Sequence, residues 1–534
     1  MKRLLLLASI ILLTSCGSIA TYNEAVTKMH PVEDLHEDVD KVYRQLQKLH
    51  PRLYQYTPRE TLDFKFDSLK TALNKPMTSR DFHKELSKVT KYVGQGHMSL
   101  SSPNTRFTRK ERKARLKTKF DISNLSFEYV DERLIIREAR GKDSLLLHAE
   151  VLKVNDDDAI KLFNTYKEIV ASDGYNTTFH DRVVGYRFLG YYAIHNGRFD
   201  SISLTLRNSD STFVKSYKRE LKNKKKTETD SSKQDSLKLK KPKKLSKAQR
   251  KLKRKEDKIK SKLRRKKNKK YGYNYSTKKY NRNLSFIGKD STVALLKIRS
   301  FTRGKYKDFY EETFTRIDSA QSKHLIIDLR NNFGGRLNEI QNLYSYLTDK
   351  NFTLINRSET NTRLPLLKTA MSNSSSTGTK LFYGILSPVI IAHNLIATSK
   401  KDGQLYYKFK ASKAHEPNPL NFKGKIFVLI NGNSFSASSV LSTQLDGDNR
   451  ATFVGEETGG AYNGTVAGYY KNYTLPNTKV RARIGLMHID SKHKTDPDGY
   501  GIKPDVEILP TYQDRLDNID PEIDWVLTKI GQKN

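Results

Sequence analysis

The sequence predicts an α/β fold, and two stretches about a hundred residues apart carry this prediction. His324 to Gly335 has the pattern of a buried strand that runs into a glycine-rich turn, and a helical pattern follows from Arg336 to Leu347. Ile426 to Ile430 is a second apolar strand, and it runs into a serine-rich turn at 431–439. Short apolar runs bounded by turn residues are typical of buried strands, and strands that alternate with helices indicate an α/β sheet.

The N-terminal residues have the pattern of a bacterial export signal. A short basic region, Met1 to Arg3, precedes an apolar run from Leu4 to Leu13 that is too short to span a bilayer. The residues Leu13-Thr14-Ser15-Cys16 resemble the box at which bacterial lipoproteins are cleaved and acylated. Cys16 is the only cysteine in the chain, so internal disulfides are excluded.

This resemblance implies a place in the bacterial cell envelope. The residue after the cysteine is Gly17 and not aspartate, which in lipoproteins favours the outer membrane over retention at the inner one. We therefore expect a signal peptide over 1–16, a tether over 17–31, and a protein that is anchored to the membrane through lipidated Cys16 and faces the periplasm. A plain secretory signal with an incidental cysteine is the alternative.

The strong positive charge belongs mainly to one segment. The formal net charge is +40, and residues 215–282 hold 31 Lys and Arg against 6 Asp and Glu. Such a segment cannot bury enough apolar surface to fold alone, although it can form a solvated helix. We interpret 215–282 as a basic low-complexity insertion. The functional alternative is attraction to an anionic polymer or to a membrane surface.

Two domains are predicted ahead of this insertion. Residues 32–117 are expected to be a helical domain, in which one helix face is formed by Phe82, Leu86, Val89 and Val93. Residues 118–214 change to strand patterns, with a strand, a turn and a helix from Glu150 onward. This second region resembles a divergent PDZ domain.

The remaining chain, 283–534, is predicted to be the largest domain. Val293 to Ile298 and Leu325 to Leu329 are apolar enough to be buried strands. The stretch 350–422 has no clear pattern apart from an apolar run from Leu386 to Ile396. Outside the export signal, no stretch is long and apolar enough to predict a membrane span.

Four motifs in this domain resemble those of the S41 serine peptidases, which include the C-terminal processing (tail-specific) proteases and the tricorn core. The motifs are Asp328-Leu329-Arg330-Asn331-Asn332-Phe333-Gly334-Gly335, Ser434-Phe435-Ser436-Ala437-Ser438, the segment from Arg450 to Gly460, and the segment from Gly499 to Val506. The resemblance covers about 290 to 510. It implies a catalytic core of ββα units like that of crotonase and ClpP, a peptide or protein substrate, and no cofactor.

The resemblance places the chemistry in two of these turns. The family's nucleophile is the middle serine of its turn, which is Ser436 here, at the start of a helix. The next amide, Ala437 N–H, and an amide of Gly334 or Gly335 would then bind the oxyanion. One such donor typically contributes about 3–4 kcal/mol of transition-state stabilisation. The two outer serines of the turn are interpreted as helix caps and small packing residues.

A serine near its free pKa is a poor nucleophile, so the site needs a base. The tail-specific branch uses a lysine at the position that is Ala461 here, and no lysine follows until Lys471. The tricorn-like branch takes a histidine from the segment ahead of the core and a carboxylate from near the closing motif. By position these are His97 and Asp498. We therefore predict a Ser436–His97–Asp498 triad.

Several residues near these positions have alternative interpretations. Asp498 could be a simple turn residue, and Asp496 or His488 could take its place. Asp328 and Arg330 are interpreted as a structural pair that holds its turn through charge-assisted hydrogen bonds. The sequence has no H-E-x-x-H motif or clustered ligand spacing, so no metal site is predicted.

Three functions remain open from the sequence. The first is a lipid-anchored serine peptidase of the cell envelope. The second is a catalytically inactive protein of the same fold that binds an apolar or peptide ligand, as do the retinoid-binding proteins of the eye that resemble this family. The third is a protein that binds an anionic polymer through its basic insertion. Hydrogen-bond reach between Ser436 and His97 in the folded chain would favour the first function.

Overall fold

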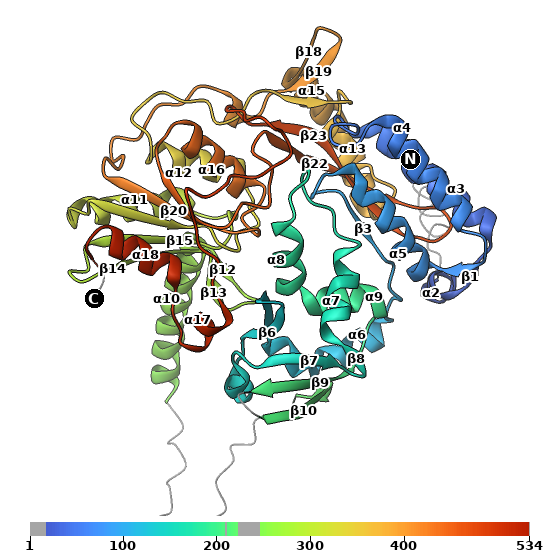
Figure 1. The fold of residues 1–534 in the computed structure, drawn as a ribbon, viewed down its shortest axis with the longest axis horizontal. Helices are drawn as coiled ribbons and strands as arrows, with labels where there is room; N and C mark the ends of the chain where they lie inside the picture. The colour runs from blue at the N-terminus through green and yellow to red at the C-terminus, as the bar shows by residue number, and fades with distance from the viewer. Residues whose placement is uncertain (1–17, 209–210, 223–245, 533–534) are drawn as a thin grey trace, which may run out of the picture.

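The computed structural model describes residues 18–208, 211–222 and 246–532 (Figure 1). Within these residues the fold is α/β, which confirms the predicted class, and it contains three six-stranded sheets. The signal peptide, Cys16 and Gly17 lie outside the described residues, as does the basic stretch 223–245.

The first sheet forms the centre of the C-terminal core. Its strands, in spatial order, are β14 Arg282–Ile287, β15 Val293–Ile298, β16 His324–Asp328, β20 Lys425–Ile430, β21 Thr452–Gly455 and β24 Val506–Glu507. Only β14 pairs antiparallel, and all later neighbours are parallel. Parallel strands are covered on both faces, which explains their continuous apolar runs.

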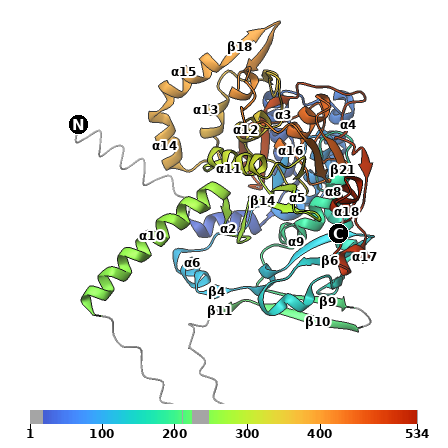
Figure 2. The ribbon, with the colours of Figure 1, turned by 90° about the vertical axis from the view of Figure 1, so that its left-hand side faces the viewer.

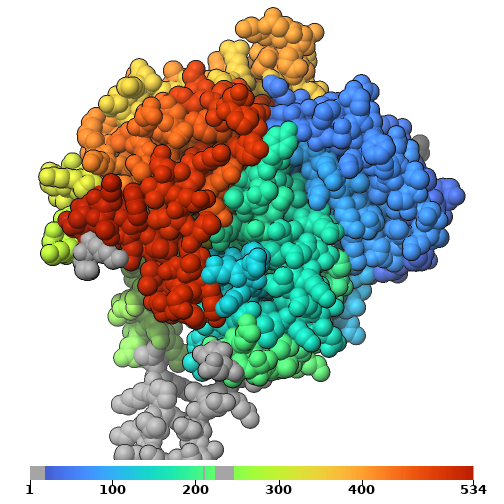
Figure 3. Space-filling model, viewed as in Figure 1, coloured from blue at the N-terminus to red at the C-terminus, as the bar shows by residue number. Residues whose placement is uncertain are grey.

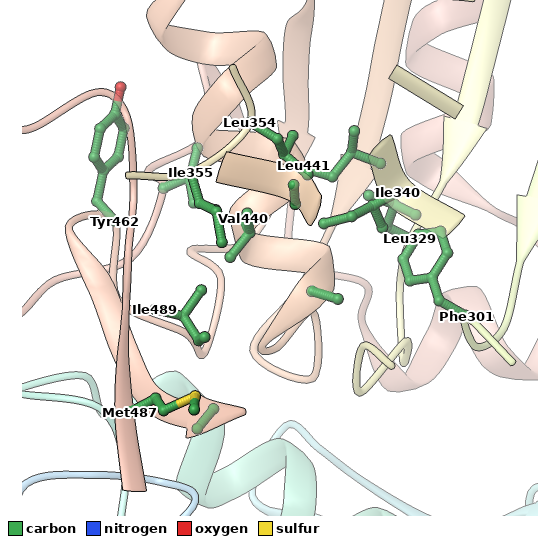
Figure 4. Packing of buried hydrophobic residues seen from close by; sticks show 14 of the residues in the cluster. Phe301, Leu329, Ile340, Leu354, Ile355, Val440, Leu441, Tyr462, Met487 and Ile489 are labelled. Atoms are coloured by element: carbon green, nitrogen blue, oxygen red, sulfur yellow. The ribbon is translucent and has the colours of Figure 1, made fainter. Parts of the chain in front are cut away.

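Helices cover the two faces of this sheet. One face packs on α11 Tyr306–Ser319, α12 Leu337–Ser345 and α16 Ala437–Gly447, and the other packs on α18 Pro521–Lys529, which follows the short helix α17 Tyr512–Leu516. Figure 4 shows side chains from α12, α16 and the neighbouring strands meeting in the main apolar core. Leu441 and Ile340 are fully buried there.

The second sheet lies beside the first and contains a long hairpin. Its strands, in spatial order, are β18 Thr398–Lys401, β19 Gln404–Tyr407, β17 Ser358–Thr360, β23 Arg481–Asp490 and β22 Gly464–Thr474. A strand from the N-terminal region, β3 Ser99–Ser101, pairs antiparallel with β23, with Leu100 opposite Ala482. This pairing brings the segment just before β3 to the edge of the core.

The third sheet belongs to a separate domain that packs against the core (Figure 3). Its strands are β5 Ser126–Val130, β6 Arg133–Glu138, β7 Glu150–Val154, β8 Asp157–Asp158, β9 Ser201–Asn208 and β10 Ser211–Lys218, and its helices are α7 Ala159–Lys167, α8 Thr178–Tyr186 and α9 Phe188–Asn196. The strand, turn and helix expected from Glu150 onward are β7, β8 and α7. The expected boundary at 214 falls inside β10.

The N-terminal region is helical. It contains α2 Ile19–Thr27, α3 Val32–Leu49, α4 Arg59–Ala72 and α5 Ser79–Thr90, with the short pair β1 Met29–His30 and β2 Met77–Thr78 between them. The hydroxyl of Thr78 caps α5 by accepting a hydrogen bond from Asp81 N–H. The apolar face expected on this helix is buried, with Phe82 and Leu86 fully covered.

Several shorter segments connect these parts of the chain. Two links near the third sheet are α6 Arg109–Leu116 and the pair β4 Thr118–Lys119 with β11 Glu220–Leu221. The described end of the basic insertion is the long helix α10 Lys247–Tyr271, followed by the hairpin β12 Tyr273–Asn274 and β13 Lys279–Tyr280.

The stretch that the sequence left without a pattern, 350–422, contains three helices besides its strands. They are α13 Pro365–Ala370, α14 Thr377–Ile385 and α15 Ser387–Ala397. No single helix within the described residues is both long and apolar enough to cross a bilayer. The pair α14 and α15 has the required length and composition only when taken together, and it is bent by 70°.

A buried carboxylate joins the N-terminal helices to the long hairpin. Asp38 of α3 accepts hydrogen bonds from the backbone N–H groups of Asn477 and Thr478 and from the Thr478 hydroxyl, in the turn between β22 and β23. Asp38 and Thr478 are both fully buried. Unpartnered buried donors are costly, so this contact holds α3 in place relative to the hairpin.

We expect Asp38→Ala to lower the free energy of unfolding by about 2–4 kcal/mol, because it leaves three buried donors without an acceptor. Asp38→Asn, which keeps one acceptor, should cost less. Urea unfolding followed by tryptophan fluorescence and circular dichroism measures the effect. The matched control is Asp40→Ala on the exposed side of α3, which should change stability by less than about 1 kcal/mol. Equal stability of Asp38→Ala and the parent protein would contradict the proposed role of Asp38.

Candidate active site

The two turns singled out in the sequence lie side by side because their strands, β16 and β20, are parallel neighbours. Hydrogen bonds from the outer serines connect them. The hydroxyl of Ser434 donates to the carbonyl of Leu329 at 2.9 Å, and the hydroxyl of Ser438 donates to the carbonyl of Asn332 at 2.8 Å. These two serines therefore hold the turns together, in keeping with the structural role expected for them.

The middle serine, Ser436, immediately precedes α16 and has an unusual backbone. Its φ is 59° and its ψ is −119°. A positive φ is costly for a residue with a side chain, and such conformations are retained where the surrounding structure enforces them. A sharp strand-to-helix turn of this kind presents a serine hydroxyl beside the first amides of the helix.

The structure brings His97 to this serine. His97 Nε2 lies 3.0 Å from Ser436 Oγ, within hydrogen-bond distance. The imidazole stacks on Phe435, with ring centroids 4.7 Å apart, and its other side faces Tyr470. His97 lies two residues before β3, so the pairing of β3 with β23 positions the imidazole beside the nucleophile turn.

The imidazole is neutral over the physiological pH range. Burial and, to a smaller extent, the positive charge of Arg483 lower the pKa of His97 to about 3. A neutral imidazole is the form that can accept a proton. The lowered pKa also means that His97 contributes stability above the unfolded value of about 6.5, and that this contribution is lost as the pH falls toward 3.

The second ring nitrogen contacts Thr465, which sequence reasoning did not identify. His97 Nδ1 lies 3.2 Å from Thr465 Oγ1, and this hydroxyl donates to Asp173 Oδ1 at 3.1 Å. A hydroxyl has one proton, so a Thr465 that donates to Asp173 must accept from His97 Nδ1–H. This arrangement favours the tautomer in which Nε2 carries the lone pair and can accept the proton of Ser436.

Asp173 contacts both the core, through Thr465, and the N-terminal region, through Gly96. Its Oδ1 also accepts the backbone N–H of Gly96 at 2.7 Å, next to His97, and its side chain is fully buried. Burial raises the pKa of Asp173 to about 7, although the hydrogen bonds from Gly96 and Thr465 oppose that shift. The charge of this carboxylate therefore changes near neutral pH.

Asp498 does not contact His97, in contrast to the sequence-based triad. Its carboxylate accepts Gln55 Nε2 at 2.9 Å and the N–H of Gly499 at 2.7 Å. Gln55 in turn accepts a hydrogen bond from Gln95. The carboxylate of Asp498 is therefore hydrogen-bonded within its own loop and to the N-terminal region. Thr465, and not Asp498, lies beside Nδ1 of His97.

The two alternative partners of the imidazole are not beside it either. His488 lies on β23 opposite Val466 and is buried, and its ring nitrogens make no hydrogen bond within the described residues. Asp496 makes no recorded contact with His97 in the described part of the chain. The carboxylate linked to His97 is therefore Asp173, through Thr465.

Two amides remain available for an oxyanion beside Ser436. Gly334 N–H donates to Asn332 Oδ1 at 2.9 Å, so it is already engaged. The amides of Gly335 and Ala437 have no acceptor in the described structure. Both glycines are needed, because a Cβ would lie 2.6 Å from Ala437 N at Gly334 and 1.9 Å from Phe301 O at Gly335.

Asp328 and Arg330 form the structural pair that the sequence indicated. Asp328 Oδ1 accepts the backbone N–H and the Nε–H of Arg330, and the guanidinium continues to Asp520. Desolvation alone would raise the pKa of Asp328, but the charges of Arg330 and Lys297 outweigh it and hold that pKa far below its usual range. The pair stabilises the turn below the oxyanion amides.

A cavity of about 620 Å³ opens over Ser436 and His97. Its walls combine apolar and aromatic side chains with three guanidinium groups, from Arg187, Arg336 and Arg483, and none of the residues that line it is acidic. No cluster of three or more His, Cys, Asp or Glu side chains suited to a metal ion occurs in the described residues.

Comparison with known proteins supports the family resemblance. The sequence model of Peptidase family S41 matches residues 292–508, which contain both turns. The solved structure of mature CPAF complexed with lactacystin superposes with a TM-score of 0.60 at 15% identity, over 94% of this chain and 98% of that chain. Mature CPAF alone gives a TM-score of 0.56 at 15% identity, over 94% and 97%. At this identity the likeness concerns the fold alone.

A search of curated protein sequences found no match. The likeness to this family therefore rests on the sequence model over residues 292–508, and the superposed structures show a shared fold. His97, Asp173 and the N-terminal helices lie outside the matched segment. Over residues 292–508, the segment that contains both turns, the chain is similar to the members of peptidase family S41.

Proposed function

We propose that this protein is a serine endopeptidase of the cell envelope in which Ser436 is the nucleophile and His97 the general base. The observation that carries the proposal is the 3.0 Å contact between His97 Nε2 and Ser436 Oγ. A nucleophile and a base within hydrogen-bond reach, with the base oriented by a third group, is the arrangement that acyl transfer requires.

The reaction follows from the positions of these groups. Ser436 Oγ attacks the scissile carbonyl carbon while His97 Nε2 takes its proton, and the amides of Ala437 and Gly335 bind the negative oxygen that forms. The imidazolium then returns the proton to the leaving amine. Water hydrolyses the acyl-enzyme by the same sequence, with His97 again as the base.

Thr465 and Asp173 act as positioning residues in this proposal. The Thr465 hydroxyl links Nδ1–H to the Asp173 carboxylate, so it fixes the tautomer and places a negative charge near the imidazolium that forms. No lysine is needed as the base, which agrees with Ala461 at the position of the lysine in the tail-specific branch.

The proposed location of the protein is the membrane surface, to which an acylated Cys16 would attach it. Support comes from the basic and apolar residues that precede this cysteine and from its place in the Leu13-Thr14-Ser15-Cys16 box. An outer-membrane lipoprotein facing the periplasm would meet peptides and proteins of the envelope as substrates.

A fluorophosphonate probe should label Ser436 covalently. We expect no labelling of Ser436→Ala and a labelling rate about 10²–10⁴-fold lower for His97→Ala, because the hydroxyl then lacks its base. Gel fluorescence and peptide mass spectrometry measure both. The matched control is Ser442→Ala in the same helix, whose hydroxyl has no hydrogen-bond partner, and it should label normally. If His97→Ala labels as fast as the parent protein, the base is misassigned, and if the parent protein does not label, the chain is a binding protein of the same fold.

The pH dependence should report Asp173 and not His97. The labelling rate should rise with pH around an apparent pKa of about 7, because the carboxylate form of Asp173 is needed to hold the Thr465 hydroxyl. Asp173→Asn should flatten this rise between pH 6 and 8. Thr465→Val should slow labelling by about 10- to 100-fold, since the tautomer is no longer fixed, while Thr465→Ser should keep most of the rate. An unchanged profile in Asp173→Asn would remove Asp173 from the mechanism.

The charge of the cavity should select among peptides. Three guanidinium groups and no carboxylate line it, so a quenched fluorescent peptide with glutamates flanking its cleavage site should be cleaved at least about tenfold faster than the lysine counterpart. Arg187→Gln, at the exposed rim, should reduce this ratio, and raising the salt concentration should reduce it further. A ratio below one would contradict the argument from charge.

A further inference from the structure

The helices α14 and α15 expose an unusual amount of apolar surface. Neighbouring positions of this helical pair leave seven large apolar side chains between 38% and 87% exposed: Leu381, Phe382, Ile385, Leu386, Val389, Leu395 and Ile396. We call these seven residues the apolar patch. Single exposed apolar residues are ordinary, whereas a contiguous group on one element marks a binding surface.

Few contacts bind this pair to the rest of the protein. No residue of α14 is buried, and only Ile390 and Asn394 of α15 are buried. The Asn394 side chain accepts the backbone N–H of Leu366 in α13, which anchors the pair to the core. The pair therefore projects from the body (Figure 2), and the side chains of its apolar patch are exposed.

The same two helices carry basic residues and no acidic ones. Residues 377–397 contain Lys380 and His393 but no aspartate or glutamate. Helices with an exposed apolar face and no acidic residue of their own are compatible with an anionic lipid surface.

A second, independent feature lies on the same side of the molecule. Figure 2 shows α10 projecting toward the side on which α14 and α15 project. The helix α10 has 15 Lys and Arg against 2 Asp and Glu over residues 247–271, and none of its residues is buried. Leu252, Ile259 and Leu263, spaced seven and four residues apart, form an apolar stripe that is about 60% exposed within this basic surface.

We propose that this side of the protein binds an anionic lipid bilayer, with the apolar patch of α14 and α15 in the interfacial layer and the lysines and arginines of α10 on the headgroups. A helix needs about 20 residues to cross the hydrocarbon core, and α14 and α15 have 9 and 11. Each helix therefore lies in the interface and does not cross it. The contact is separate from acylation of Cys16 and from the peptidase site.

A lipid surface fits these observations better than the other occupants of an apolar surface. A second copy of the chain would bring two α10 helices of the same strong charge to one side of the assembly, where they repel. A nucleic acid would bind α10 but would leave the apolar patch in water. Anionic lipid offers negative headgroups and an apolar interior in one surface, and two weak signals of this kind together give stable membrane attachment.

The test is co-sedimentation with vesicles. It uses the chain that begins at Ser18, which lacks Cys16, so that no acyl group can attach the protein to the vesicles. We expect the protein to bind vesicles of phosphatidylcholine that contain about 30% phosphatidylglycerol, because these have a negative surface. Binding to vesicles of phosphatidylcholine alone should be weak. Ile385→Asp/Val389→Asp/Ile396→Asp should weaken binding to the anionic vesicles by at least about tenfold, because three charges enter the apolar patch. Lys258→Glu/Lys262→Glu/Lys266→Glu in α10 should weaken it and reduce its dependence on salt.

The matched control is Leu145→Asp/Val214→Asp/Leu509→Asp, which changes three exposed apolar residues outside the apolar patch and α10 and should bind as the parent does. Circular dichroism confirms that each variant is folded. Fluorophosphonate labelling of Ser436 tests the peptidase proposal separately, so a failure of the lipid proposal is distinguished from a failure of the peptidase proposal. Equal vesicle binding by the patch variant and the parent overturns the inference. A second result would also overturn it: the parent is a dimer in sedimentation equilibrium, the patch variant is a monomer, and neither protein binds vesicles. The apolar patch would then be a contact between two copies of the chain.

Discussion

The arrangement of the candidate site depends on one hydrogen bond between His97 and Ser436, two residues that are 339 positions apart in the sequence. Neither side chain can reach the other unless the N-terminal region is held against the core. The contacts that supply this constraint include the pairing of β3 with β23, the hydrogen bonds of Asp38 to the turn between β22 and β23, and the link from Gly96 through Asp173 to Thr465. The geometry of the site is therefore a property of domain packing as much as of the two turns.

The turns themselves form a rigid unit built from small residues. Ser434 and Ser438 connect the nucleophile turn to the glycine turn, while Gly334 allows its backbone to approach Ala437 closely. The unfavourable φ of Ser436 is held by these contacts on both sides. A site whose reactive groups are fixed before the substrate arrives loses less free energy to reorganisation during the reaction.

Local patterns in the sequence were sufficient to predict the buried strands, the helix that begins at Ser79 and the two turns. These elements depend on hydrophobic periodicity and on the chemistry of glycine and serine. The groups behind the imidazole could not be predicted in this way. Thr465 and Asp173 belong to no local motif, and only the packing of two domains brings them to His97. Asp498 follows the family position, but its short side chain is engaged by Gln55.

The pairing of β3 with β23 has a consequence for synthesis of the protein. His97 emerges early from the ribosome, whereas Thr465 and the strand at 481–490 that receives β3 are among the last parts to be made. A nascent chain that ends before residue 464 has no strand to place the imidazole beside the Ser436 hydroxyl. The chain must therefore be synthesised at least through this strand before His97 and Ser436 can meet.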